Sequence, residues 1–189
     1  GLVAPNGTGK STMLNVMMNY LKPQKGEIVI NETKRYKNPK ENSQIYQLIS
    51  MMPDQNDLYE HLSGYDHLKL YQKMWRNKDM EITDVVGRLQ MKHYIKQRVG
   101  GYSLGMKQRL CFAMQLMTDT SIMLMDEVMN GLDPNNVELI SNVILEKKEE
   151  GKTIIIASHL LENLEKYADR IFFLFSGELE LFLDKKQGY

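Results

Sequence analysis

A glycine-rich stretch near the start of the chain, residues 4–12, has the composition of a loop that binds phosphate. It nearly matches the pattern G-x-x-x-x-G-K-[ST]. Glycines let consecutive backbone N–H groups converge on phosphate oxygens, and the helix that follows directs its N-terminus at the same oxygens. Lys10 would reach the β- and γ-phosphates, while the Ser11 hydroxyl would bind Mg²⁺. The predicted nucleotide-binding residues of this loop are Asn6, Gly7, Thr8, Gly9, Lys10, Ser11 and Thr12.

The loop departs from the pattern at its first position, where Ala4 replaces glycine. Alanine costs more than glycine wherever φ is positive or the backbone must approach a ligand closely. The core from Gly7 to Ser11 remains. Taken alone, such a loop could equally be a glycine-rich turn that begins a helix.

Two carboxylates follow an apolar run, Ile122–Met125, that has the character of a buried strand. Such a strand would deliver Asp126 to the coordination shell of Mg²⁺. Glu127, one residue on, faces another direction and could polarise an attacking water molecule. A pair of this kind is often only a strand-end turn, but the Gly-Leu-Asp-Pro segment at residues 131–134 makes the pattern more specific.

The segment from Tyr102 to Arg109 reads Y-S-L-G-M-K-Q-R and resembles the signature sequence of ABC (ATP-binding cassette) ATPases, commonly L-S-G-G-Q followed by Q/K-Q-R. The glycine-rich loop, the signature, the acidic strand, the Gly-Leu-Asp loop and a late His159 occur in the order of that family. The resemblance covers nearly the whole chain. Five motifs in order are jointly specific, although none is perfect.

The resemblance implies two subunits arranged head to tail, with ATP held between the glycine-rich loop of one and the signature of the other. Ser103 and Gly105 would contact the γ-phosphate bound by the partner subunit, and Asp133 would lie at the subunit interface. His159 would contact the γ-phosphate within its own subunit. The resemblance assigns catalysis to Glu127 and His159.

Three residues are predicted to bind Mg²⁺: Ser11, Asp126 and Asp54. In the family, a glutamine in the loop after a strand offers this third ligand, and Asp54 stands in its place. A carboxylate can also bind Mg²⁺. Gln55, one residue later, is the second candidate.

The signature carries Leu104 and Met106 where the commonest form has Gly and Gln. Exporters of the multidrug and peptide-antibiotic type often carry a similar S-L-G-M-K-Q-R segment, and this resemblance favours export over import. Val128 and Met129 replace a frequent Pro-Thr after the catalytic glutamate, which loosens the turn without removing a ligand.

The elements that must position these residues follow an α/β rhythm. Helices are predicted over residues 10–21, 63–75, 80–89, 105–117, 134–150 and 160–167, and strands over 27–30, 47–52, 121–125, 153–157, 170–175 and 178–183. Residues 31–44 are polar and are predicted to form a solvated connection. Apolar strands that alternate with helices indicate a parallel sheet covered on both faces.

The predicted fold is therefore α/β: a P-loop NTPase (RecA-like) core with a parallel sheet, an inserted helical subdomain and remnants of an antiparallel β subdomain. Residues 1–57 and 99–189 would form the core, and residues 58–98 the helical subdomain, of one ABC ATPase domain. The chain opens on Gly1 without an initiator Met, so we expect an N-terminal truncation. The adenine-stacking aromatic residue of the family would then lie upstream of Gly1.

The composition limits the function classes. Among 189 residues, 24 Lys and Arg balance 24 Asp and Glu, which gives no whole-chain electrostatic argument for nucleic acid. The single cysteine, Cys111, cannot form an internal disulfide and is interpreted as a core residue. No run approaches the roughly 18 consecutive apolar residues of a membrane-spanning helix.

The leading hypothesis is an ATP-hydrolysing subunit, cytoplasmic and peripheral on the inner face of the cell membrane, that powers a separate membrane permease and pairs with a second ATPase subunit. The alternative is a soluble ABC ATPase that acts on ribosomes without a permease. A GTPase or small-molecule kinase ranks far lower, because the sequence lacks an N-K-x-D guanine reader and neither class explains the signature. No nucleic-acid partner is expected.

Overall fold

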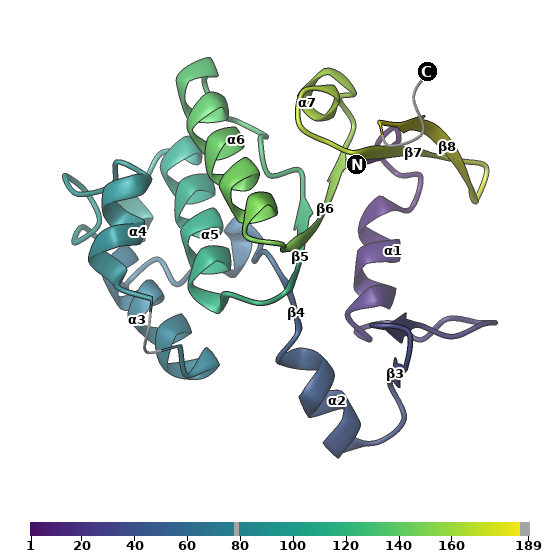
Figure 1. The fold of residues 1–189 in the computed structure, drawn as a ribbon. Coiled ribbons are helices and arrows are strands. Elements are labelled where there is room, and N and C mark those ends of the chain that lie inside the picture. The colour runs from purple at the N-terminus through teal and green to yellow at the C-terminus, as the bar shows by residue number, and fades with distance from the viewer. Residues whose placement is uncertain (78–79, 186–189) are drawn as a thin grey trace. The chain divides into compact units, whose positions relative to one another are not determined.

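A six-stranded sheet in the order β4-β5-β6-β1-β7-β8 organises one of the two compact units of the chain in the computed structural model, which describes residues 1–77 and 80–185 (Figure 1). Its strands are β1 (Leu2–Val3), β4 (Ile49–Met51), β5 (Ile122–Asp126), β6 (Thr153–Ser158), β7 (Arg170–Phe175) and β8 (Glu178–Asp184). All neighbours pair in parallel except β7 and β8, which are antiparallel. The mainly parallel sheet confirms the predicted α/β class.

The core of this part lies between the sheet and helix α1 (Lys10–Met17). Leu14 of α1 and Leu124 of β5 are completely buried there. Burial on both faces of β5 explains its continuous apolar run, since a strand covered on one face would alternate. The short helix α7 (Glu162–Glu165) connects β6 to β7.

A small antiparallel pair, β2 (Val29–Ile30) with β3 (Lys34–Arg35), precedes helix α2 (Pro39–Tyr46). The prediction of a solvated connection over residues 31–44 was wrong here. The Asn38 side chain caps the helix by accepting from the Glu41 N–H at 3.0 Å, and proline occupies the first helical position. Both are helix-start signals. A single buried apolar residue, Ile45, anchors the helix, so the polar composition concealed it.

The other compact unit is helical. It contains the 3₁₀ turns η1 (Gln55–Asp57) and η2 (Val99–Gly101) and the helices α3 (Gly64–Trp75), α4 (Ile82–Arg88), α5 (Leu104–Thr118) and α6 (Pro134–Glu149). Ser63 caps α3 in a reciprocal pair with Asp66.

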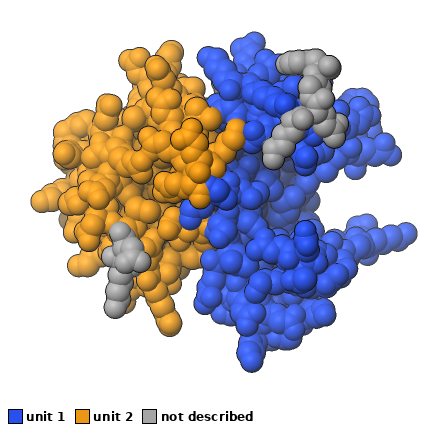
Figure 2. Space-filling model, viewed as in Figure 1, with its two compact units in different colours: residues 1–51, 121–128, 151–189 blue, residues 52–120, 129–150 orange. Residues whose placement is uncertain are grey.

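The chain divides into two compact units (Figure 2). The first comprises residues 1–51, 121–128 and 151–189, and the second residues 52–120 and 129–150; residues 78–79 and 186–189 lie outside the described part. The second unit holds α5 and α6 as well as α3 and α4. The division into a core and a helical subdomain over residues 58–98 stays a prediction. Within residues 1–77 and 80–185, none of the helices has the length and apolar character needed to cross a membrane.

Candidate nucleotide-binding site

The glycine-rich loop connects β1 to α1 in the first unit. Gly7 and Gly9 have φ values of +81° and +105°, in the region that side chains with a Cβ rarely adopt. Ala4 has no such φ, is 1% exposed, and donates its backbone N–H to the Ser158 carbonyl at 3.2 Å. Alanine therefore fits the first position of the loop without backbone strain, and the departure from the pattern is accommodated.

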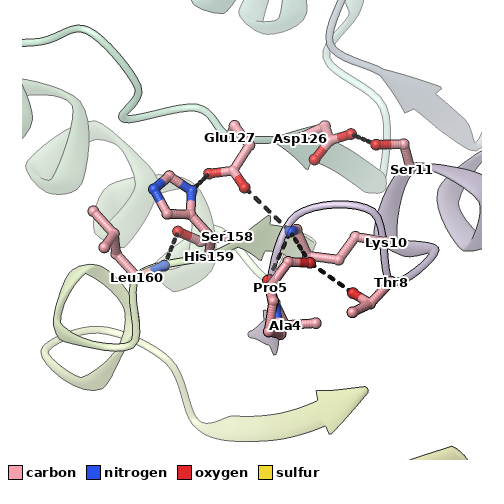
Figure 3. A network of polar contacts seen from close by, with 10 residues as sticks. All are labelled: Ala4, Pro5, Thr8, Lys10, Ser11, Asp126, Glu127, Ser158, His159 and Leu160. Carbon is pink, nitrogen blue, oxygen red and sulfur yellow. Dashed lines mark hydrogen bonds and ion pairs between the residues drawn. The ribbon is translucent and has the colours of Figure 1, made fainter. Parts of the chain in front are cut away.

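The Lys10 ammonium lies beside Ala4 and Pro5 at the start of the loop (Figure 3). It donates to the Ala4 carbonyl at 2.7 Å and the Pro5 carbonyl at 3.2 Å, and its side chain is 5% exposed. The Thr8 hydroxyl also donates to the Pro5 carbonyl, at 2.7 Å. These bonds fix the positive charge at the loop, where a phosphate anion would meet it.

An oxygen-rich pair lies at the end of β5. The Ser11 hydroxyl donates to one carboxylate oxygen of Asp126, although the two residues are 115 positions apart. The other carboxylate oxygen, Oδ1, is buried and has no hydrogen-bond partner among the described residues. Buried polar oxygens normally have a partner, so this one has capacity for a cation. Hydroxyl and carboxylate oxygens suit Mg²⁺, which commonly takes few protein ligands and completes its shell with phosphate and water.

Glu127 contacts both Lys10 and His159. One of its carboxylate oxygens, Oε1, forms an ion pair with Lys10 at 3.4 Å, and the other, Oε2, lies 2.9 Å from Nδ1 of His159. Since a carboxylate accepts hydrogen bonds, Nδ1 of the imidazole donates. Glu127 has φ +49°, which is uncommon for a residue other than glycine. Its backbone N–H is bonded to the Ala157 carbonyl at 2.9 Å, which helps to hold this conformation.

Ser158 is a contributor that the sequence reasoning missed. It is 5% exposed, and its hydroxyl accepts from the Leu160 N–H at 3.1 Å, which shapes the turn that carries His159. Its carbonyl also holds Ala4. A serine at the end of a strand, two residues before the N–H that it accepts, is a recognisable local turn signal.

The remaining predicted residues belong to the second unit. Ser103 caps α5 by accepting from the Met106 N–H at 3.3 Å, and Gly105 lies in the first turn of that helix. Asp133 caps α6; its bonds from the Asn136 backbone and side chain lower the pKa of the carboxyl group.

Of the two candidates for a third Mg²⁺ ligand, Asp54 caps η1 and accepts from the Asn56 backbone N–H at 2.8 Å. The Gln55 amide donates to Gln108 of α5. The structure thus gathers Lys10, Ser11, Asp126, Glu127 and His159 in one unit. The predicted residues outside the glycine-rich loop and this cluster lie in the second unit, and their roles stay predictions.

Comparison with known proteins places these motifs in a family. Residues 1–130 match the family model described as "ABC transporter". The lantibiotic transport ATP-binding protein SrtF of Streptococcus pyogenes is 33% identical over 180 residues, which cover 95% of this chain and 76% of SrtF.

Solved structures agree. The cbiO1 protein from Clostridium perfringens, described as part of the ABC transporter complex cbiONQ, has a TM-score of 0.79 at 25% identity, over 98% of this chain and 76% of its own. The dimeric ATP-binding cassette MJ0796, bound to ADP and Pi, has a TM-score of 0.83 at 25% identity, over 95% of this chain and 82% of its own.

Proposed function

Because the chain belongs to the ABC transporter family of ATP-binding domains, we propose that it hydrolyses Mg²⁺-ATP to power transport, in the export direction, by a separate membrane permease. The observation that carries the proposal is the cluster in the first unit. A loop built for phosphate, a buried lysine and a carboxylate–histidine pair meet there. Binding of phosphate and activation of water need these groups together.

The chain's own residues account for binding. The N–H groups of the loop and the N-terminus of α1 would hold the phosphate oxygens, and Lys10 would neutralise their charge. Ser11 and Asp126 would hold Mg²⁺, with Asp54 as the predicted third ligand. When bound, Mg²⁺ supplies further neutralisation of phosphate charge.

Glu127 would activate water for hydrolysis. Its carboxylate would accept a proton from the water molecule that attacks the γ-phosphorus. His159 holds one carboxylate oxygen at 2.9 Å and so restricts the direction in which Glu127 can act. Lys10 is bonded to the other oxygen at 3.4 Å, so a phosphate that attracts Lys10 also changes the surroundings of Glu127.

The partners follow from what the relatives are described to do. MJ0796 is described as dimeric, which supports pairing with a second ATPase subunit. Ser103, Gly105 and Asp133 of one subunit would then lie at the nucleotide site of the other. The cbiO1 protein is part of a transporter complex, and SrtF is named for lantibiotic transport. We infer a permease partner and a position at the inner face of the membrane. Export rests on the S-L-G-M-K-Q-R signature.

The central test replaces Glu127 with glutamine in the full protein. Glu127→Gln keeps the size of the side chain and one acceptor oxygen but removes its negative charge and its basicity, so ATP binding should be retained and hydrolysis lost. The matched control is Glu178→Gln, because Glu178 is exposed on β8. Hydrolysis by Glu127→Gln at the parent rate would overturn the role proposed for this residue.

A further inference from the structure

The first residue of α5, Leu104, is a large apolar side chain that is 57% exposed. Its inner side lies against Gly131. A Cβ built on Gly131 would come within 2.5 Å of Leu104 Cδ2, closer than real Cβ atoms approach other atoms, and 3.0 Å from Leu104 Cγ, which is a tight contact. Gly131 also has φ +72°. The leucine therefore occupies the space that the missing side chain of Gly131 leaves open.

The first turn of α5 and the loop around Gly131 are also close at Gly105. A Cβ on Gly105 would lie 3.5 Å from the Gly131 carbonyl oxygen and 3.7 Å from Leu132 Cδ2, which is ordinary packing distance. The first turn of α5 thus runs beside the loop of residues 129–133. Both segments belong to the second unit.

The loop of residues 129–133 is fixed at both ends. Met129 is 7% exposed at its start, and its carbonyl accepts from the Leu132 N–H at 3.3 Å. Asp133 at its end accepts from the Asn136 N–H at 3.1 Å and begins α6. Gly131, in the middle, is exposed and has the backbone freedom of glycine. Leu104 contacts the loop at this point.

We propose that Leu104 is a positioning residue, whose packing on Gly131 holds the 129–133 loop, and with it Asp133, in a fixed place beside the first turn of α5. Leu104 is also the position at which the chain departs from the glycine of the commonest signature. The consequence for activity rests on the proposed function, in which Ser103, Gly105 and Asp133 are presented together to a second copy of the chain.

Hydrogen exchange of the full protein tests the contact directly, without nucleotide. Leu104→Ala should make the backbone amides of residues 129–133 exchange about three- to tenfold faster, because the loop loses an apolar contact. Leu104→Met should keep the parent rate. Leu21→Ala is the matched control, since Leu21 is 46% exposed and lies in the other unit. Equal exchange in Leu104→Ala and the parent overturns the proposal, whatever the outcome for Glu127→Gln.

A double-mutant cycle with Gly131→Ala gives an independent test. The added methyl group strains the backbone and also collides with Leu104, so its effect on loop exchange should be smaller when residue 104 is alanine. Strictly additive effects would show that the two residues do not interact.

Steady-state kinetics test the effect of Leu104 on hydrolysis. Leu104→Ala should lower kcat about threefold or more while leaving the affinity for ADP unchanged, because the glycine-rich loop is intact and ADP lacks the γ-phosphate that Ser103 and Gly105 are proposed to contact. Faster loop exchange with an unchanged kcat would overturn this consequence.

Discussion

Replacement of Gly9 by alanine isolates the backbone requirement of the phosphate loop. Gly9 is the residue before α1, with φ +105° and ψ 11°. This φ lies beyond the left-handed region, roughly +50° to +70°, that other residues can occupy. The nearest atom to a Cβ built at this position is Leu174 Cδ2, at 4.0 Å. Gly9→Ala therefore adds no steric collision with neighbouring residues, and its effect comes from backbone strain.

The magnitude follows from that geometry. Holding a residue with a Cβ in a sparsely populated region costs about 1–3 kcal/mol. If the loop keeps its shape, the free energy of unfolding falls by this amount. If the loop relaxes to relieve the strain, its N–H groups no longer converge, and the same free energy appears as an affinity for ADP that is about 5- to 150-fold weaker.

Two measurements on the full protein distinguish these outcomes: urea unfolding measures the loss of stability, and calorimetric titration measures the loss of ADP affinity. Gly177→Ala is the matched control, because Gly177 has φ +82° and a Cβ there would meet nothing within 4 Å. It lies in the turn between β7 and β8, so it should lose similar stability and bind ADP as the parent does. Parent stability together with parent ADP affinity in Gly9→Ala would show that the phosphate loop does not need a glycine at this position.

Three further predictions concern single groups. Ser63→Ala removes the cap of α3 and should lower the free energy of unfolding by about 1 kcal/mol, measured by urea titration; no change would contradict the capping role. Burial raises the pKa of the Cys111 thiol to about 12, so a thiol reagent at pH 8 should react only after unfolding, and prompt reaction of the native protein would disprove this. Hydrogen bonds from Asn136 hold the pKa of Asp133 below the ordinary value of an aspartate, so its contribution to stability is present above the pKa of the unfolded state and is lost as the pH falls through the pKa of the folded state. An NMR titration midpoint at or above that of the aspartate in the unfolded chain would contradict this.

Much of the fold could be predicted from local patterns. The apolar run of β5 and the capping serine of α3, Ser63, are both recognisable in the local sequence, because burial and capping act over a few residues. Helix α2 was predicted to be an irregular connection, although Asn38 and Pro39 are residues typical of a helix start. It carries one buried apolar residue, Ile45, so there was too little apolar periodicity to outweigh its polar composition.

The chemical groups of the site are recognisable in the local sequence: the glycines that tolerate positive φ, the lysine, the carboxylates and the late histidine. Their order along the chain was enough to indicate the ABC family. Local sequence could not show that Glu127 lies between Lys10 and His159, or that Ala4 occupies a position without positive φ.

Strand register decided these contacts. Ala157 of β6 is the register partner of both Asp126 of β5 and Leu2 of β1. Because parallel strands end at the same edge of a sheet, the loops that follow β1, β5 and β6 meet there. Lys10, Glu127 and His159 come from those loops and their immediate continuations. The side chains are local properties of the sequence, but their meeting depends on pairing between strands more than a hundred residues apart, which only the tertiary structure sets.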